Sequence, residues 1–431
     1  MARLITLDRL TRRSVLRGGL TTGVALAAPA LIGTRAFAQQ GREIKIGFVS
    51  PSTGPIAAFG AADDYVLAGV RAAIANGIEI NGVMHPVRII TKDSQSNPNR
   101  AAEVASQLIL DDEVDLMLAS STADTTNPVA DQCELNEIPC ITTDTPWDGH
   151  FFGRGGNPAV GFDWTYHFFW GAAQVVDAYT SLWDQLDTNK KVGVLWSNDS
   201  DGVPLSNATT GFPPLFAARG YEVIDAGFHE PLSDDFSAQI ARLKDAQVDI
   251  VSGVFLPPDF TTFWVQAAQQ GFRPKAVTVA KALVFPTSVE ALGEIGAGVS
   301  TEVWWSPAHP FASGLTGQSS AELARGYMNA SGKQWIQPMG FKHAVLEVAI
   351  DVLKRTADVN DPAAIIAAII ATDYQSIVGP VNWANGPVRN AATTPVVGGQ
   401  WEQGGEFPFD LRICENRSAP EIAVQAPFRS L

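Results

Sequence analysis

Apolar, β-branched runs alternate with amphipathic stretches along most of this chain, and this alternation constrains the fold more than any other feature. The runs expected to form strands are residues 44–49, 87–91, 114–119, 138–142, 192–196, 248–255 and 276–280. The stretches expected to form helices are residues 59–76, 99–110, 127–136, 205–219, 236–246 and 259–270. Such regular alternation predicts an α/β fold built from doubly wound parallel sheets.

The alternation stops between residues 144 and 175, where aromatic residues and glycines are dense. Because a fresh strand–helix series starts at Val192, we interpret this stretch as a crossing between two α/β lobes. A chain of this length is also expected to divide into two domains. After residue 280 the order changes again, and we expect a strand at 299–305, helices at 321–330 and 341–355, and strands within 394–413.

Residues 1–38 carry the features of an export signal. Arg12-Arg13 forms a twin arginine, residues 18–32 are mildly apolar, and Ala36-Phe37-Ala38 has the small-x-small form of a cleavage site. The alternative is an anchor that stays in the membrane, but the apolar run is short for that role. We therefore expect a twin-arginine signal peptide and a periplasmic protein.

The formal net charge of the chain is −15, and the six Arg and one Asp of the leader leave −20 for the remainder. A surface this acidic repels phosphate backbones and anionic lipid, which argues against nucleic-acid or membrane-surface partners. No Gly-rich phosphate loop or helical His pair occurs, so we expect no cofactor and no metal. Cys133 and Cys140 are either bridged or reduced and buried, and both alternatives stay open.

Five short motifs follow one another in a specific order, although each is weak alone. They are Ile46-Gly47-Phe48 with Thr53-Gly54-Pro55 and Phe59-Gly60, Asp93-Ser94-Gln95-Ser96-Asn97-Pro98, Ala119-Ser120-Ser121-Thr122 with Pro128-Val129-Ala130, Ile138-Pro139-Cys140-Ile141-Thr142 and Gly379-Pro380-Val381-Asn382-Trp383. With these motifs the mature chain resembles the type I periplasmic solute-binding proteins of ABC importers, the group typified by leucine/isoleucine/valine-binding proteins. The resemblance covers nearly the whole mature length.

The resemblance implies two lobes that close over a ligand by hinge motion. Three crossings would join the lobes near residues 160–168, 303–310 and 393–400. Lobe one would hold residues 40–163 and 307–393, and lobe two residues 164–306 and 394–431. The resemblance further implies a monomer without enzymatic activity that delivers its ligand to a membrane permease.

The same resemblance places ligand-binding residues in lobe one. Phe59 would pack on the ligand, with a role as a core anchor of its own helix as the alternative. Hydroxyls and helix N-terminal amides after the third strand would grip a carboxylate, which their dipole favours; there the alternative is simple capping by Asp124 or Thr125. The expected contacts of this lobe are Phe59, Ser121, Thr122, Thr125, Asp144, Thr145 and Trp147.

In lobe two the expected ligand contacts are Trp170, Asp201, Phe255 and Lys281. Amino-acid binders of the family place an acidic residue at the position that matches Lys281, where it holds the ligand's ammonium. An unpaired buried lysine disfavours an ammonium and suits an organic anion. The alternative is that Lys281 is a solvated surface residue.

The sequence thus predicts a periplasmic substrate-binding protein that captures a small organic acid, an aromatic carboxylate being one such acid. An amino-acid receptor or a ligand sensor of the same fold is the alternative. A periplasmic oxidoreductase exported in the folded state is a more remote one.

Overall fold

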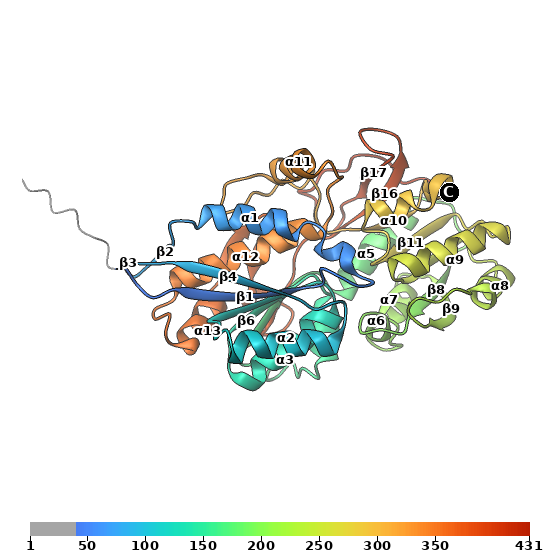
Figure 1. The fold of residues 1–431 in the computed structure, drawn as a ribbon. Helices are drawn as coiled ribbons and strands as arrows, with labels where there is room; N and C mark the ends of the chain where they lie inside the picture. The colour runs from blue at the N-terminus through green and yellow to red at the C-terminus, as the bar shows by residue number, and fades with distance from the viewer. Residues whose placement is uncertain (1–39) are drawn as a thin grey trace, which may run out of the picture. The chain divides into compact units, whose positions relative to one another are not determined.

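Two mostly parallel sheets organise residues 40–431, the part of the chain that the computed structural model describes (Figure 1). The first sheet has the strand order β15-β7-β6-β5-β1-β4, with every neighbouring pair parallel. The predicted α/β class is therefore confirmed. The strands of this sheet are β1 (Ile44–Ser50), β4 (Val87–Asp93), β5 (Leu116–Ser120), β6 (Cys140–Thr143), β7 (Thr165–Phe168) and β15 (Ala391–Ala392).

The second sheet has the order β17-β16-β12-β11-β10-β8-β9. Its strands from β9 to β12 are parallel, whereas β16 and β17 join as an antiparallel edge. The expected strands of the C-terminal tail form this edge. The strands are β8 (Lys191–Ser197), β9 (Glu222–His229), β10 (Ile250–Val254), β11 (Ala276–Ala280), β12 (Ser300–Val303), β16 (Val397–Gln403) and β17 (Phe409–Glu415).

Alternate side chains of the first sheet enter two different cores. Leu116 and Leu118 of β5 pack in the core beneath α1 and α12, whereas Met117 and Ala119 pack in the core beneath α2 and α3. A strand buried on both faces reads as a continuous apolar run, as this one does. We call this sheet and its covering elements the first lobe. Its helices are α1 (Asp63–Ala73), α2 (Pro98–Leu110), α3 (Ala123–Asn136), α4 (Trp147–Gly153), α11 (Ser320–Ser331), α12 (Pro338–Arg355) and α13 (Pro362–Ile370).

The second sheet and the elements around it form the second lobe. Its helices are α5 (Ala172–Trp183), α6 (Gly202–Leu205), α7 (Phe212–Ala218), α8 (Ser237–Asp245), α9 (Pro257–Gln269) and α10 (Pro286–Glu290). Short elements complete the two lobes. They are the hairpins β2 (Ile78–Ile80)–β3 (Val83–His85) and β13 (Asp373–Ser376)–β14 (Gly379–Asn382), and the 3₁₀ turns η1 (Ala57–Gly60), η2 (Gly293–Gly296) and η3 (Trp383–Asn385).

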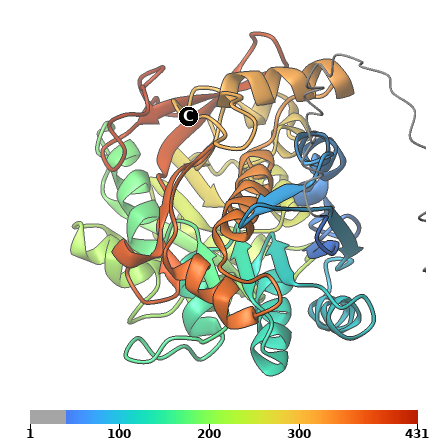
Figure 2. The ribbon, with the colours of Figure 1, turned by 90° about the vertical axis from the view of Figure 1, so that its left-hand side faces the viewer.

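The chain passes between the two sheets three times, after β7, after β12 and after β15. The late helices α12 and α13 therefore lie beside the early elements of the first lobe, as the orange and blue ribbons show (Figures 1 and 2). The first crossing falls slightly later than expected, because β7 pairs with β6 and extends the first sheet to Phe168, beyond residue 163. The lobe boundaries themselves stay a prediction, and the leader at residues 1–38 lies outside the described residues.

Two expected helices are interrupted. The stretch 205–219 holds only the end of α6 and the separate α7, because Gly211 and two consecutive prolines start a new helix at Phe212. The stretch 59–76 divides into η1 and α1. By contrast, α3 begins at Ala123, earlier than the expected residue 127.

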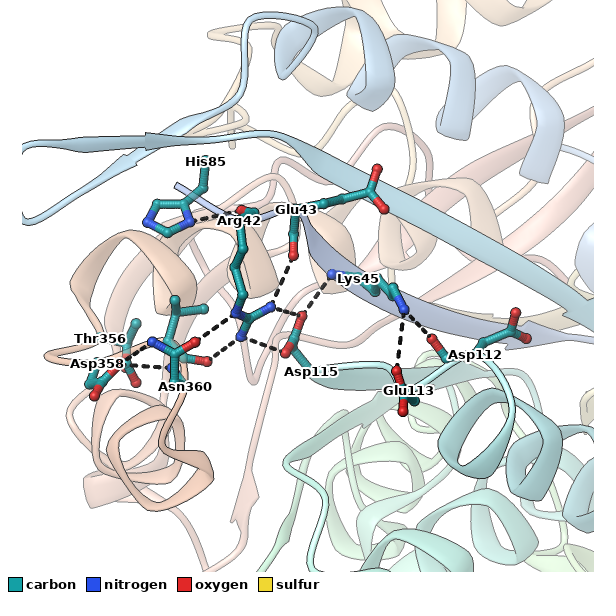
Figure 3. A network of polar contacts seen from close by, with 11 residues as sticks. Arg42, Glu43, Lys45, His85, Asp112, Glu113, Asp115, Thr356, Asp358 and Asn360 are labelled. Atoms are coloured by element: carbon teal, nitrogen blue, oxygen red, sulfur yellow. Dashed lines mark hydrogen bonds and ion pairs between the residues drawn. The ribbon is translucent and has the colours of Figure 1, made fainter. Parts of the chain in front are cut away.

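Arg42 links the start of the described chain to other parts of the first lobe through hydrogen bonds (Figure 3). Its guanidinium donates to both oxygens of Asp115 at 2.7 and 2.9 Å, to Asn360 Oδ1 at 2.7 Å and to the carbonyl of Val359 at 2.8 Å. Asp115 also accepts from the backbone N–H of Lys45. One side chain thus joins the entry to β1, the entry to β5 and the α12–α13 connection.

Candidate functional site

A cavity lies where the carboxyl ends of the strands of the two sheets meet. About 400 Å³ of space free of protein atoms lies within it, part of which is open solvent. Most of its residues end or follow a strand, which is where open α/β sheets bind ligands. The first lobe contributes Phe59, Thr122, Asp144, Pro146, Phe169 and Trp170, and the second lobe contributes Asp201, Leu205, Val254, Ala280, Lys281, Val284, Glu302 and Trp304.

Four aromatic side chains form much of the wall. Phe169 packs against Trp170 with ring centroids 4.8 Å apart, and against Trp304 at 5.2 Å. Phe59 makes an edge contact at 4.8 Å with Phe285 of the second lobe, so it packs across the cleft. All four lining rings are buried. These rings can enclose a flat apolar body, and their edge and face orientations favour an aromatic one.

Several polar atoms in the wall have no hydrogen-bond partner among the described residues. They are the indole Nε1 atoms of Trp170 and Trp304, the hydroxyl of Thr122, and Oδ1 of Asp144. Leaving a buried polar group unpaired costs about 1–3 kcal/mol each. Asp124 and Thr125, the expected alternative caps, lie inside α3, whose Ncap residue is Thr122 and has no side-chain cap bond. The residues that carry these unpaired atoms all line the cavity, which makes them candidates to bind an acceptor there.

Asp144 is the buried carboxyl on the first-lobe wall. Its Oδ2 accepts hydrogen bonds from the hydroxyls of Ser121 and Ser120. Burial raises the pKa of Asp144 to about 7, although Lys342 and the two serine hydroxyls oppose the shift. At neutral pH this carboxyl therefore exchanges between an anionic acceptor and a neutral donor. The structure places the expected residue Ser121 behind Asp144 and not on the cavity wall.

The loops that carry these residues hold a strained backbone. Ser121, Thr122, Asp144 and Lys281 have φ values of 66°, 68°, 70° and 72°. Non-glycine residues in this region cost about 1–3 kcal/mol each and persist only where the surroundings fix them. All four positions follow the carboxyl ends of β5, β6 and β11. Three of these four residues, Thr122, Asp144 and Lys281, line the cavity, although positive φ values also occur in other loops, for example at Glu137 and Leu232.

Lys281 is neither a free cation nor a surface residue. It is 7% exposed, and its Nζ donates to Asp201 Oδ2 at 2.7 Å and to Asp199 Oδ2 at 3.0 Å. Burial opposes its charge, but the two carboxylates outweigh that effect and raise the pKa of Lys281. The expectation of an unpaired lysine awaiting a ligand anion is therefore wrong. Asp199 and Asp201, in the loop after β8, already neutralise it. Asp201 was itself an expected site residue.

Asp201 connects the two lobes. While Lys281 holds its Oδ2, its Oδ1 accepts from the backbone N–H of Ala123 at 3.3 Å. Ala123 is the first residue of α3 in the first lobe, whereas Asp201 precedes α6 in the second. A helix N-terminus favours such a negative charge. The N–H that was expected to grip a ligand carboxylate thus binds a carboxylate of the protein itself.

Glu302 is the functional candidate that the sequence analysis missed. It is 2% exposed, lines the cavity at the end of β12, and accepts from the hydroxyls of Tyr179 and Thr301. Burial raises the pKa of Glu302 against these hydrogen bonds. A single acid inside the apolar run 299–305 was the available signal. Trp304 in the same run, and Phe169 beside the expected Trp170, were missed as well.

Six of the expected site residues line one cavity: Phe59, Thr122, Asp144, Trp170, Asp201 and Lys281. Two expected hydroxyl residues lie elsewhere. Thr125 exchanges a hydrogen bond with Ser94 at 3.0 Å within the first lobe. Thr145 accepts from His167 at 2.7 Å through its carbonyl oxygen. Both therefore position loops around the cavity without lining it.

The two remaining expected aromatics also lie outside the cavity wall. Trp147 starts α4 and packs against Phe152 at 5.9 Å. Phe255 stacks on His229 at 5.2 Å and on neighbouring rings in the core of the second lobe. Successive side chains along a strand point to opposite faces of the sheet. The side chain of Phe255 points to the face that packs in the core.

Cys133 and Cys140 are both free and fully buried, so the disulfide alternative is not present in this structure. They lie in the apolar core between α2, α3 and the first sheet. Burial, followed by the neighbouring Cys140 thiol, raises the pKa of Cys133 well above its usual value. Buried reduced thiols of this kind pack as small hydrophobic groups.

Within residues 40–431, no group of three His, Cys, Asp or Glu side chains is arranged to hold a metal ion. In the same residues, no helix has the length and apolarity needed to cross a membrane.

Two doubly wound lobes with a ligand-sized cavity at their facing sheet edges define the architecture of a bilobal solute-binding protein. The periplasmic binding protein family matches residues 43–406. A curated relative, the Leu/Ile/Val-binding protein homolog 3 of Brucella melitensis, is 24% identical over 364 residues, which are 81% of this chain and 88% of the relative. The chain belongs to this family, the type I periplasmic binding proteins of ABC transporters.

Solved structures show the same fold. A leucine-binding protein from Thermotoga maritima has a TM-score of 0.71 and 20% identity, covering 87% of this chain and 99% of its own. An ABC-transporter solute-binding protein from Rhodopseudomonas palustris, solved with 3,4-dihydroxybenzoic acid, has a TM-score of 0.68 and 20% identity, covering 88% of this chain and 99% of its own. At this identity the likeness establishes the architecture of both lobes.

Proposed function

We propose that this protein captures a small organic acid with a flat, apolar body, such as an aromatic carboxylate, in the interlobe cavity by hinge closure. It then delivers the acid to the membrane permease of an ABC importer. It acts as a monomer in the periplasm, reaches it through the twin-arginine route and catalyses no reaction on its ligand. We place the hinges at the three crossings, the first directly after β7 and the others near residues 303–310 and 393–400.

The observation that carries this proposal is the set of unpartnered donors on the cavity wall. Among residues 40–431, the indole N–H groups of Trp170 and Trp304 have no hydrogen-bond acceptor, and the Thr122 hydroxyl has no partner. An acid placed between them would satisfy all three groups with its oxygens. Uncharged donors in a dry cavity can bind an anion because the local dielectric strengthens each hydrogen bond.

The charge balance of the cavity decides how an acid can bind. Lys281 is already neutralised by Asp199 and Asp201, so it does not supply the attraction. Asp144 has a pKa of about 7 because of its burial. When protonated, Asp144 is neutral and can donate a hydrogen bond to a bound carboxylate. The acid is thus bound together with a proton on Asp144.

An amino-acid ligand is the second candidate, and one observation favours it. When ionised, Asp144 presents Oδ1 as an unpartnered acceptor, to which a ligand ammonium could donate. The relatives support both candidates, since one binds leucine according to its name and another was solved with a dihydroxybenzoic acid. A ligand sensor would use the same cavity and differ only in its protein partner.

Isothermal titration calorimetry with aromatic carboxylates and with branched-chain amino acids tests the proposal. We expect tight binding of an acid and no binding of the zwitterions; tight binding of amino acids alone would contradict it. Trp304→Phe should keep the ring, remove the N–H and weaken the acid about five- to tenfold. Trp305→Phe is the matched control, because the Trp305 indole N–H is also buried and unpartnered but does not line the cavity.

A further inference from the structure

We propose that Asp201 is an internal latch, whose carboxylate binds the N-terminus of α3 across the cleft and occupies the place of an acid ligand's carboxylate until the ligand displaces it. This inference deepens the proposed function and rests on it for the identity of the competing ligand. The closure of the ligand-free protein, however, depends only on the contacts within the chain.

The first part of the argument is the bridge itself. Asp201 belongs to the second lobe, where Lys281 fixes its Oδ2 at 2.7 Å, and its Oδ1 reaches the N–H of Ala123 in the first lobe at 3.3 Å. Asp201 is 7% exposed. A carboxylate that is fixed on one side and hydrogen-bonded to the other lobe stabilises the closed arrangement without any ligand.

The second part of the argument concerns the hydrogen-bond donors near the N-terminus of α3 that Asp201 does not bind. α3 spans 14 residues, and its N-terminus carries the partial positive charge that attracts anions. Thr122, directly before it, is 3% exposed and lines the cavity, as do Trp170 and Trp304. Its hydroxyl and the two indole N–H groups have no partner among the described residues. Asp201 therefore pairs only with the backbone N–H of Ala123, and the hydroxyl and indole donors stay available to a ligand.

The third part is the weakness of the cross-cleft contact compared with the bonds that hold Asp201 in its own lobe. The Ala123 hydrogen bond is at the long end of the range for N–H donors, whereas the Lys281 bond is short and charge-assisted. A ligand carboxylate that also satisfies Thr122 and the indoles gains more bonds than Asp201 gives up. Displacement therefore leaves the Lys281 pair intact within the second lobe.

Small-angle X-ray scattering of the ligand-free mature protein tests the latch. Asp201→Asn should increase the radius of gyration because the charged bridge is lost and the lobes open. Asp199→Asn is the matched control, since Asp199 also binds Lys281 but has no hydrogen bond to the first lobe among the described residues. The Asn amide oxygen can still accept from the backbone N–H groups of Asp201 and Gly202, as Asp199 does. We expect its scattering curve to match that of the unaltered protein. An unchanged radius for Asp201→Asn, or an equal increase for both variants, would overturn the latch.

Calorimetry with an aromatic carboxylate tests the displacement. Asp201→Asn should tighten acid binding about three- to tenfold, because an intramolecular competitor has been weakened. Weaker binding would mean that Asp201 helps to bind the ligand, and unchanged binding would mean that it plays no part. Either result would refute displacement. If no acid binds the unaltered protein, the proposed ligand class fails and displacement fails with it, while the scattering comparison still decides whether the latch exists.

Discussion

The ammonium of Lys281 lies 2.7 Å from Asp201 Oδ2 inside the second lobe, and both side chains are more than nine-tenths buried. Asp199 adds a second carboxylate at 3.0 Å. A buried lysine paired twice serves to hold two acids in place, and it has no charge left to attract a ligand. In the proposed function, the aromatic walls, the uncharged donors and the other carboxyls of the cavity would therefore select the ligand.

Replacing Lys281 should destabilise the protein strongly. Lys281→Met leaves Asp199 and Asp201 as uncompensated buried charges, and we expect the free energy of unfolding to fall by about 3–5 kcal/mol. Urea denaturation followed by tryptophan fluorescence measures this change. Combining Lys281→Met with Asp199→Asn and Asp201→Asn should recover most of the loss, because no buried charge remains. If the free-energy losses of the single substitutions instead add in the combined variant, the three residues do not form one interacting unit.

Acid binding should depend on pH through Asp144, whose pKa is raised by burial to about 7. An anionic ligand prefers the protonated carboxyl, so its dissociation constant should be constant below pH 7 and rise above it by up to about tenfold per pH unit. An ammonium ligand would show the reverse, with binding weakened below pH 7. Calorimetry between pH 6 and 8.5 separates the two, and Asp144→Asn should abolish either dependence.

The same carboxyl should make stability depend on pH. Its pKa is raised from 3.8 to about 7 on folding, so the folded state binds a proton that the unfolded state has released. Its contribution is thus fully present below the unfolded pKa and is lost as pH rises to 7. Asn tolerates a positive φ and can still accept from Ser121. We expect Asp144→Asn to raise the free energy of unfolding at pH 8. This gain should exceed the gain at pH 5 by on the order of 2 kcal/mol. Equal gains at both pH values would contradict the assignment.

The Arg42 cluster should contribute moderately to stability. Arg42→Gln removes its bonds to Asp115, Asn360 and the carbonyl of Val359, but its side chain is 38% exposed, so water replaces part of what is lost. We expect a loss of about 1–2 kcal/mol in the free energy of unfolding. Arg88→Gln on β4 is the control and should change little, because Arg88 is exposed and has no side-chain hydrogen bond among the described residues. A neutral Arg42→Gln would contradict the anchoring role.

The sheet architecture was predictable because each buried strand is a continuous apolar run, as Leu116–Ser120 illustrates. Parallel strands also bring their carboxyl ends to one edge, so residues that follow them, such as Thr122, Asp144 and Lys281, could be expected at one site. Local sequence thus determines which loops face the cavity.

The partners of those residues could not be predicted in the same way. Lys281 and Asp199 are far apart in the chain, and only the side-by-side packing of β8, β10 and β11 brings them together. The orientation of aromatic residues is equally a tertiary property. Phe255 enters the core of its own lobe while Trp304 lines the cavity, although both follow apolar strands.

A crystal structure of the protein with its tightest-binding acid tests the central claim most directly. The claim predicts ligand density in the interlobe cavity, with acceptor oxygens within roughly 3.2 Å of Nε1 of Trp170 and of Trp304. An acid bound elsewhere, or a cavity ligand that leaves both indole N–H groups without an acceptor, would contradict it.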